Sequence, residues 1–83
     1  MIKDRLISLF TRDRTSVWFE ERTGISRYRW GNIRNGKARL TDAEIEAVCN
    51  VFPQYALWLV SGKVAPEIGQ MSPELVDEHR DGT

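Results

Sequence analysis

Cysteine and histidine are scarce in this chain, with one of each among 83 residues. A single cysteine cannot form an internal disulfide, which fits a reducing compartment, and we expect Cys49 to be a small core residue. A thiol–imidazole site would have to join Cys49 to His79, and no third orienting group accompanies them. No cluster has metal-ligand spacing, and no glycine-rich phosphate loop follows a strand. We therefore expect no enzymatic activity, no metal and no cofactor.

Long apolar runs and a net charge are missing as well. No stretch approaches the roughly 20 apolar residues that a membrane span requires, and no signal peptide opens the chain, so we expect a cytoplasmic protein without a membrane partner. The 12 basic and 12 acidic residues cancel. Residues 1–39, however, carry ten Lys/Arg and four Asp/Glu (net +6), whereas residues 40–83 carry two and eight (net −6). This asymmetry favours a basic face for a polyanion.

Apolar residues recur at helical spacing and predict an all-α domain over residues 1–62, followed by a tail over residues 63–83. The five expected helices run over 2–11, 15–22, 26–35, 41 to about 50–52, and 53–61. In the connection after the first helix, Arg12 and Arg14 either touch phosphate or are solvated. Thr41 and Glu44 form a capping box for the fourth helix. In the tail, Ser72 begins a helix-start signal that predicts a short helix to about residue 78.

The stretch 23–37 predicts a tight turn, a helix of about three turns and a basic exit loop. Ser26 is suited to cap this helix, and Gly36 is suited to end it because glycine adopts the left-handed conformation without a Cβ penalty. Trp30 and Ile33 share the face that should point inward. The opposite face carries hydrogen-bonding groups edged with arginines: Tyr28, Asn32, Asn35, Arg27, Arg29 and Arg34. An outward strip of this kind suits a helix that enters a DNA major groove.

Residues 16–37 resemble the helix-turn-helix of the Cro/C1-type (XRE-like) phage repressors. The resemblance rests on Thr23-Gly24-Ile25-Ser26, on the inward residue Trp30, and on Ile33-Arg34-Asn35-Gly36-Lys37, and it extends over about residues 1–62. It implies a compact five-helix, lambda-repressor-like domain that binds double-stranded DNA. The chain departs from the family at Trp30, where a smaller aliphatic residue is usual, and at Glu20, where a small residue is usual. A glutamate there must reach outward or pair with a nearby arginine.

The expected function is therefore a small phage-type repressor that binds a palindromic operator as a homodimer through the helix 26–35. Geometry and the resemblance assign base contacts to Arg27, Tyr28, Asn32 and, as either a base or a phosphate contact, Arg29. We expect phosphate contacts at Ser16, Ser26, Asn35, Lys37 and Arg39, with Ser26 also serving as a cap. The expected dimer contacts are Tyr55, Trp58, Leu59, Val64 and Ile68.

Several alternatives stay open at this point. The chain could be the DNA-binding antitoxin of a toxin–antitoxin pair, with the apolar segment 53–61 or the tail holding a small protein partner. It could also be a protein-interaction module that kept the fold and lost DNA binding. The tail either covers its own domain or completes a dimer. Gly31 either permits close approach to DNA or to the preceding helix, or is a flaw that tertiary packing tolerates.

Overall fold

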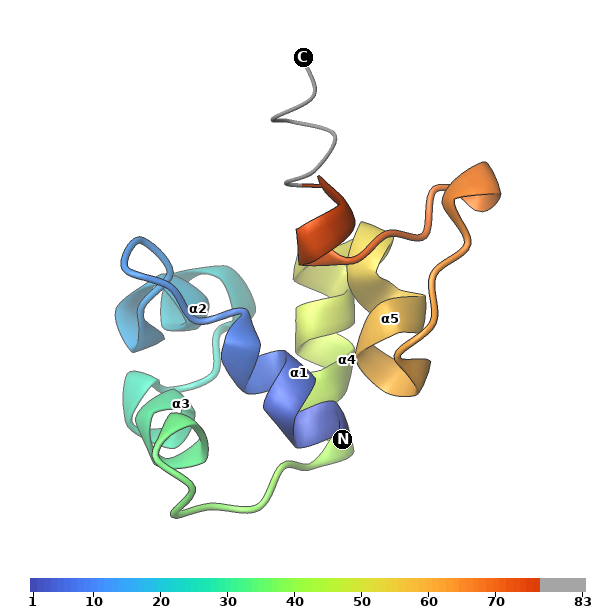
Figure 1. Cartoon of the computed structure of the whole chain (residues 1–83). Helices are drawn as coiled ribbons and strands as arrows, with labels where there is room; N and C mark the ends of the chain where they lie inside the picture. Colours follow the sequence, from blue (N-terminus) through green and yellow to red (C-terminus); the bar gives the residue numbers. More distant parts are fainter. Residues whose placement is uncertain (77–83) are drawn as a thin grey trace.

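A computed structural model of the chain describes residues 1–76 (Figure 1). Its elements are α1 (Ile2–Ser8), α2 (Ser16–Thr23), α3 (Arg27–Arg34), α4 (Asp42–Val51), η1 (Pro53–Tyr55), α5 (Ala56–Ser61) and η2 (Pro66–Ile68). The helices α2 and α3 lie together on one side of α1, and α5 lies on its other side (Figure 1). The all-α prediction is confirmed, and each of the five predicted helices is present, with different bounds for the first and the fifth.

The first helix is shorter than predicted, because it ends at Ser8 and not near residue 11. The backbone N–H groups of Leu9 and Phe10 each bond three residues back at 3.0 Å, so the last turn tightens and cannot continue as an α-helix. The Nε of Arg14 donates to the Leu9 carbonyl at 2.8 Å, and its guanidinium lies over an aromatic ring. Arg14 therefore holds the end of α1. This role differs from both expectations for Arg14, which were a phosphate contact and a solvated side chain.

One aromatic-rich core joins all five α-helices. Its buried members are Leu6, Leu9, Phe10, Phe19, Trp30, Ile33, Val48, Phe52, Tyr55 and Leu59. The rings of Phe10 and Phe19 lie 4.4 Å apart between centroids, and those of Phe19 and Trp30 lie 5.1 Å apart. Cys49 packs against this core, and burial raises the pKa of its thiol. The bulky rings let a short chain bury enough apolar surface to fix α1, α2 and α3 around them.

The segment that follows α4 turns before it becomes helical again. Pro53 begins the 3-10 turn η1, so α5 starts at Ala56 and not at Pro53 as the sequence suggests. Gly62 ends α5 with a positive φ of 77°, so the helix stops at Ser61, the last residue of the predicted range. The chain changes direction after α4. Because Pro53 has no backbone N–H to donate at this point, a short 3-10 turn forms there.

Residues 70–76 fold back onto η1 and α5. The side chain of Gln70 accepts from the backbone N–H of Leu57 at 2.9 Å and donates to the carbonyl of Pro53 at 3.1 Å. The N–H of Met71 donates to the carbonyl of Gln54 at 2.7 Å. Ser72 accepts from the N–H of residue 75, which confirms the predicted helix start. This part of the tail covers its own domain, while the expected end of its helix near residue 78, like His79, lies outside the described residues.

Two kinds of feature are missing from the described part of the chain. None of the helices within residues 1–76 has both the length and the apolarity to cross a membrane. Over the same range, no three side chains of His, Cys, Asp or Glu are grouped so that they could hold a metal ion.

Candidate nucleic-acid interface

The α2–turn–α3 unit is set by caps at both helices. Thr15 caps α2 by accepting from the N–H of Trp18, and Ser26 caps α3 by accepting from the N–H of Tyr28 at 3.1 Å. Between them, Gly24 has a φ of 76°, a conformation that residues with a Cβ rarely adopt. The two helices pack against each other more extensively than any other pair of elements. The unit is therefore a helix-turn-helix, as the sequence predicts.

The hydroxyl of Thr23 is a hydrogen-bond hub at this turn that sequence reasoning misses. It donates to the carbonyl of Phe19 at 2.6 Å and accepts from the indole Nε1 of Trp30 at 3.1 Å and from the N–H of Ile25 at 3.2 Å. A buried indole N–H needs an acceptor. Thr23 supplies that acceptor and so satisfies the one polar group that the side chain of Trp30 brings into the core.

The helix α3 has one fully buried face and one exposed face. Trp30 and Ile33 are 0% exposed, whereas Tyr28 is 79% exposed and Asn32 and Asn35 are exposed as well. The predicted orientation of the helix is therefore confirmed. These neutral hydrogen-bonding side chains follow one another along its outer surface to the C-cap Asn35, and such groups can bond to base edges or to phosphate oxygens.

The end of α3 aims the basic exit loop. Gly36 has a φ of 76°, and the N–H groups of Gly36 and Lys37 donate to the carbonyls of Ile33 and Asn32 at 3.1 and 2.8 Å. This pair of bonds is a Schellman motif, and it confirms Gly36 as the stop signal. The segment at and directly after the end of α3 carries three exposed side chains, those of Asn35, Lys37 and Arg39. These expected phosphate contacts therefore lie together in one short segment.

Arg27 is paired with Glu20 across the two helices of the motif. The carboxylate of Glu20 accepts from the backbone N–H of Arg27 at 2.6 Å, from its Nε at 3.1 Å and from its Nη2 at 2.9 Å. These hydrogen bonds lower the pKa of Glu20 and raise that of Arg27. Glu20 thus pairs with an arginine, which was one of the two arrangements expected for it, and Arg27 stays at the exposed first position of α3.

Arg29 is turned toward α4, and its expected role as a base or phosphate contact stays a prediction. Its Nη2 donates to Glu44 at 2.7 Å and to the carbonyl of Arg39. Glu44 also accepts from the N–H and the hydroxyl of Thr41 and so completes the predicted capping box. Burial raises the pKa of Glu44, but the hydrogen bonds from Arg29 and Thr41 outweigh it and lower the pKa overall. Arg29 therefore anchors the exit loop to α4.

The predicted phosphate contact Ser16 lies at the start of α2, close to α3. A Cβ built on Gly31 would lie 3.9 Å from the Oγ of Ser16, which is an ordinary van der Waals contact. The approach of α2 to α3 consequently does not require glycine at position 31. This leaves close approach to DNA, or a tolerated flaw, as the explanations for Gly31.

Two of the five predicted dimer contacts are wrong. Leu59 is 0% exposed and Tyr55 is 7% exposed, because both pack into the core of their own domain. The helix α5 is apolar on most sides, and η1, α1 and α4 already cover the side that carries Leu59. Trp58 is half-buried, whereas Val64 and Ile68 are exposed, so these three keep side-chain surface for a second protomer.

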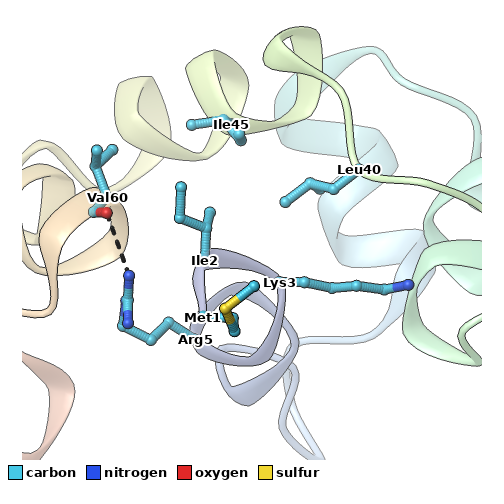
Figure 2. A pocket seen from close by; sticks show the side chains of 7 residues that line it. All are labelled: Met1, Ile2, Lys3, Arg5, Leu40, Ile45 and Val60. Atoms are coloured by element: carbon cyan, nitrogen blue, oxygen red, sulfur yellow. Dashed lines mark hydrogen bonds between the residues drawn. The ribbon is translucent and has the colours of Figure 1, made fainter.

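A hollow of about 490 Å³ lies apart from this interface, between α1, α5 and the start of α4 (Figure 2). Its lining is Met1, Ile2, Lys3, Arg5, Leu40, Ile45 and Val60. In Figure 2, Arg5 bonds to the carbonyl of Val60, and Ile2 points toward Ile45. None of the expected DNA contacts lines the hollow, so it is not part of the candidate interface.

No family model and no curated protein sequence matches the chain. Among solved structures, it is similar to Pf6r from the filamentous phage Pf6 of Pseudomonas aeruginosa PA01, with 34% sequence identity and a TM-score of 0.85. The similarity covers 96% of this chain and 94% of that chain, so it reaches beyond residues 1–62 into the tail. The chain belongs to the same family as the phage protein Pf6r.

Proposed function

We propose that this protein is a sequence-specific double-stranded DNA-binding transcriptional regulator that inserts α3 into the major groove. The observation that carries the proposal is the division of α3, which buries Trp30 and Ile33 completely and leaves Tyr28, Asn32 and Asn35 exposed. Membership of a phage protein family supports a regulator of the small phage-repressor kind, and the Cro/C1-type assignment stays a prediction.

The proposed contacts divide by chemistry. The amide of Asn32 can form a two-bond contact with adenine, and the guanidinium of Arg27 can do the same with guanine. Tyr28 adds a third group to this base-reading set. The proposed phosphate contacts are Ser16, Ser26, Asn35, Lys37 and Arg39. Residues 27–39 contain five Lys/Arg and no acidic residue, which favours attraction to the DNA backbone over this segment.

We further propose that the protein acts as a homodimer on a palindromic operator, with half-sites about 34 Å apart along the helix axis. Trp58, Val64 and Ile68 are the apolar side chains that remain for the contact between protomers. A two-fold dimer places two copies of α3 in successive major grooves on the same side of the duplex, and this arrangement requires a palindrome.

The test is selection of bound duplexes from a random pool, followed by titration of the selected duplex at several salt concentrations. We expect a palindromic consensus and a steep fall of affinity with salt, because each phosphate contact releases counterions. Sedimentation of the complex should show two protomers per site. A pool that remains random at moderate salt would refute base reading by α3 and would direct attention to a protein partner.

A further inference from the structure

The carboxylate of Glu20 is committed entirely to one neighbour. Its Oε2 accepts from the backbone N–H of Arg27, and its Oε1 accepts from both the Nε and the Nη2 of the same side chain. The side chain of Glu20 is 30% exposed, and that of Arg27 is 48% exposed. The pair therefore lies at the surface of the motif, where an ion pair adds little to stability because solvent screens it. Stability therefore does not explain why Glu20 is paired with the first residue of α3.

The hydrogen-bonding pattern leaves one side of the guanidinium available. The Nε–Nη2 edge faces Glu20, whereas Nη1 has no hydrogen-bond partner among residues 1–76. The end formed by Nη1 and the second N–H of Nη2 still offers two roughly parallel donors, which is the arrangement that a two-bond contact with guanine requires. The N-terminal residues of a recognition helix are the ones that contact base edges.

We propose that Glu20 is a positioning residue for DNA recognition, which holds Arg27 with its free guanidinium edge available to one base pair. This inference rests on the proposed function. An arginine side chain has several rotatable bonds, and ordering it on binding costs conformational entropy. With Glu20 already holding the side chain at two of its nitrogens, part of that ordering takes place before DNA arrives.

The same carboxylate must also weaken the attraction to DNA, because it adds a negative charge beside a basic surface. Positioning of Arg27 should increase affinity for the operator, whereas repulsion by the carboxylate should decrease affinity for every duplex. The two effects can therefore be separated. Removal of the charge alone should strengthen binding to every duplex. Removal of the contact with Arg27 should reduce discrimination at one base pair of each half-site and leave the other positions unchanged.

Glu20→Ala is the informative variant, because glutamine would keep an oxygen that can accept from the Nε and Nη2 of Arg27, and Glu21→Ala is its matched control. Glu21 is exposed on the same helix turn, and its loss removes the same charge without removing a hydrogen bond to Arg27. The measurement is the affinity of wild type and both variants for the selected operator and for single-base-pair substitutions of it. Arg27→Lys, which keeps the charge and removes the guanidinium, is measured in the same set. Thermal unfolding of each protein accompanies the binding data.

In Glu20→Ala, we expect discrimination at one base pair to fall about tenfold while binding to unrelated duplexes is unchanged or tighter. Arg27→Lys should lose discrimination at the same base pair, and Glu21→Ala should retain it. If Glu20→Ala instead retains the wild-type preference at every position, or weakens all duplexes in proportion to a loss of stability, the positioning role is refuted and the proposed function stands. If the wild type itself prefers no sequence, both proposals fail together.

Discussion

The substitution Thr23→Val tests whether the turn of the motif depends on a single hydroxyl. Valine keeps the size and branching of threonine but cannot accept a hydrogen bond. The change removes the acceptor for the indole N–H of Trp30, whose side chain is fully buried, and for the N–H of Ile25, which is half-buried. It thus leaves two donors without their partner in or near the core.

The size of the effect follows from those two donors. An unsatisfied buried donor costs about 1–3 kcal/mol, and the less buried N–H of Ile25 should cost near the lower end because water can replace part of the contact. We therefore expect the free energy of unfolding to fall by about 2–3 kcal/mol. For a domain of this size, that corresponds to a decrease in Tm of about 10–20 °C.

The free energy of unfolding is measured by urea unfolding, followed by tryptophan fluorescence and circular dichroism. Trp30→Phe removes the indole N–H, so Thr23→Val should cost less in that background than in the wild type, and the difference gives the coupling between the two residues. A loss below about 0.5 kcal/mol in the single variant, or equal losses in both backgrounds, would refute the reasoning, because the hydroxyl would then not be the acceptor on which Trp30 depends.

Four further substitutions test the start of α4, the helix α3 and the exit loop. Glu44→Gln should lower the free energy of unfolding by about 2 kcal/mol at neutral pH, because Arg29 loses its ionic partner and the amide has one acceptor oxygen where the buried carboxylate had two for the donors of Arg29 and Thr41. Since the folded pKa of Glu44 lies below its ordinary value of 4.5, its stabilisation is present above that value and is lost as the pH falls through the folded pKa. Acid titration of wild type and variant should therefore converge at low pH, and curves that stay parallel would contradict the cause given for the shift. Gly31→Ala should raise the free energy of unfolding by about 0.5–1 kcal/mol in urea titrations, because the added Cβ meets only Ser16 at an ordinary distance. Weaker operator binding by the same stabilised variant would show that glycine is there for DNA approach, and unchanged binding would show a tolerated flaw. Asn32→Ala should cost about 1–3 kcal/mol on the selected operator and relax its sequence preference, whereas Lys37→Ala should weaken all duplexes similarly and flatten the salt slope by about one unit. An unchanged preference in Asn32→Ala would mean that α3 enters the groove in another orientation.

Local signals determined most of the backbone from the sequence alone. The caps at Ser26 and Thr41 and the left-handed stop at Gly36 each act within one turn of the residue that carries them. The inward faces of Trp30 and Ile33 follow equally directly, because the angle between successive helical residues is fixed at about 100°. These features need no knowledge of the rest of the molecule, and they were sufficient to place the α2–turn–α3 unit and its exposed face.

Tertiary structure decided where the long side chains go. Arg27 and Arg29 both border the outward strip of α3, but their partners lie 7 and 15 residues away in sequence, on α2 and at the start of α4. A charged side chain with several rotatable bonds can reach many positions from one backbone, so helical periodicity alone does not choose among them. The same holds for burial in α5, where Leu59 lies inside because α1 and α4 cover that side. Periodicity therefore gave the directions of the helix faces, and only the packing of the helices decided which of their charged groups remain available to a partner.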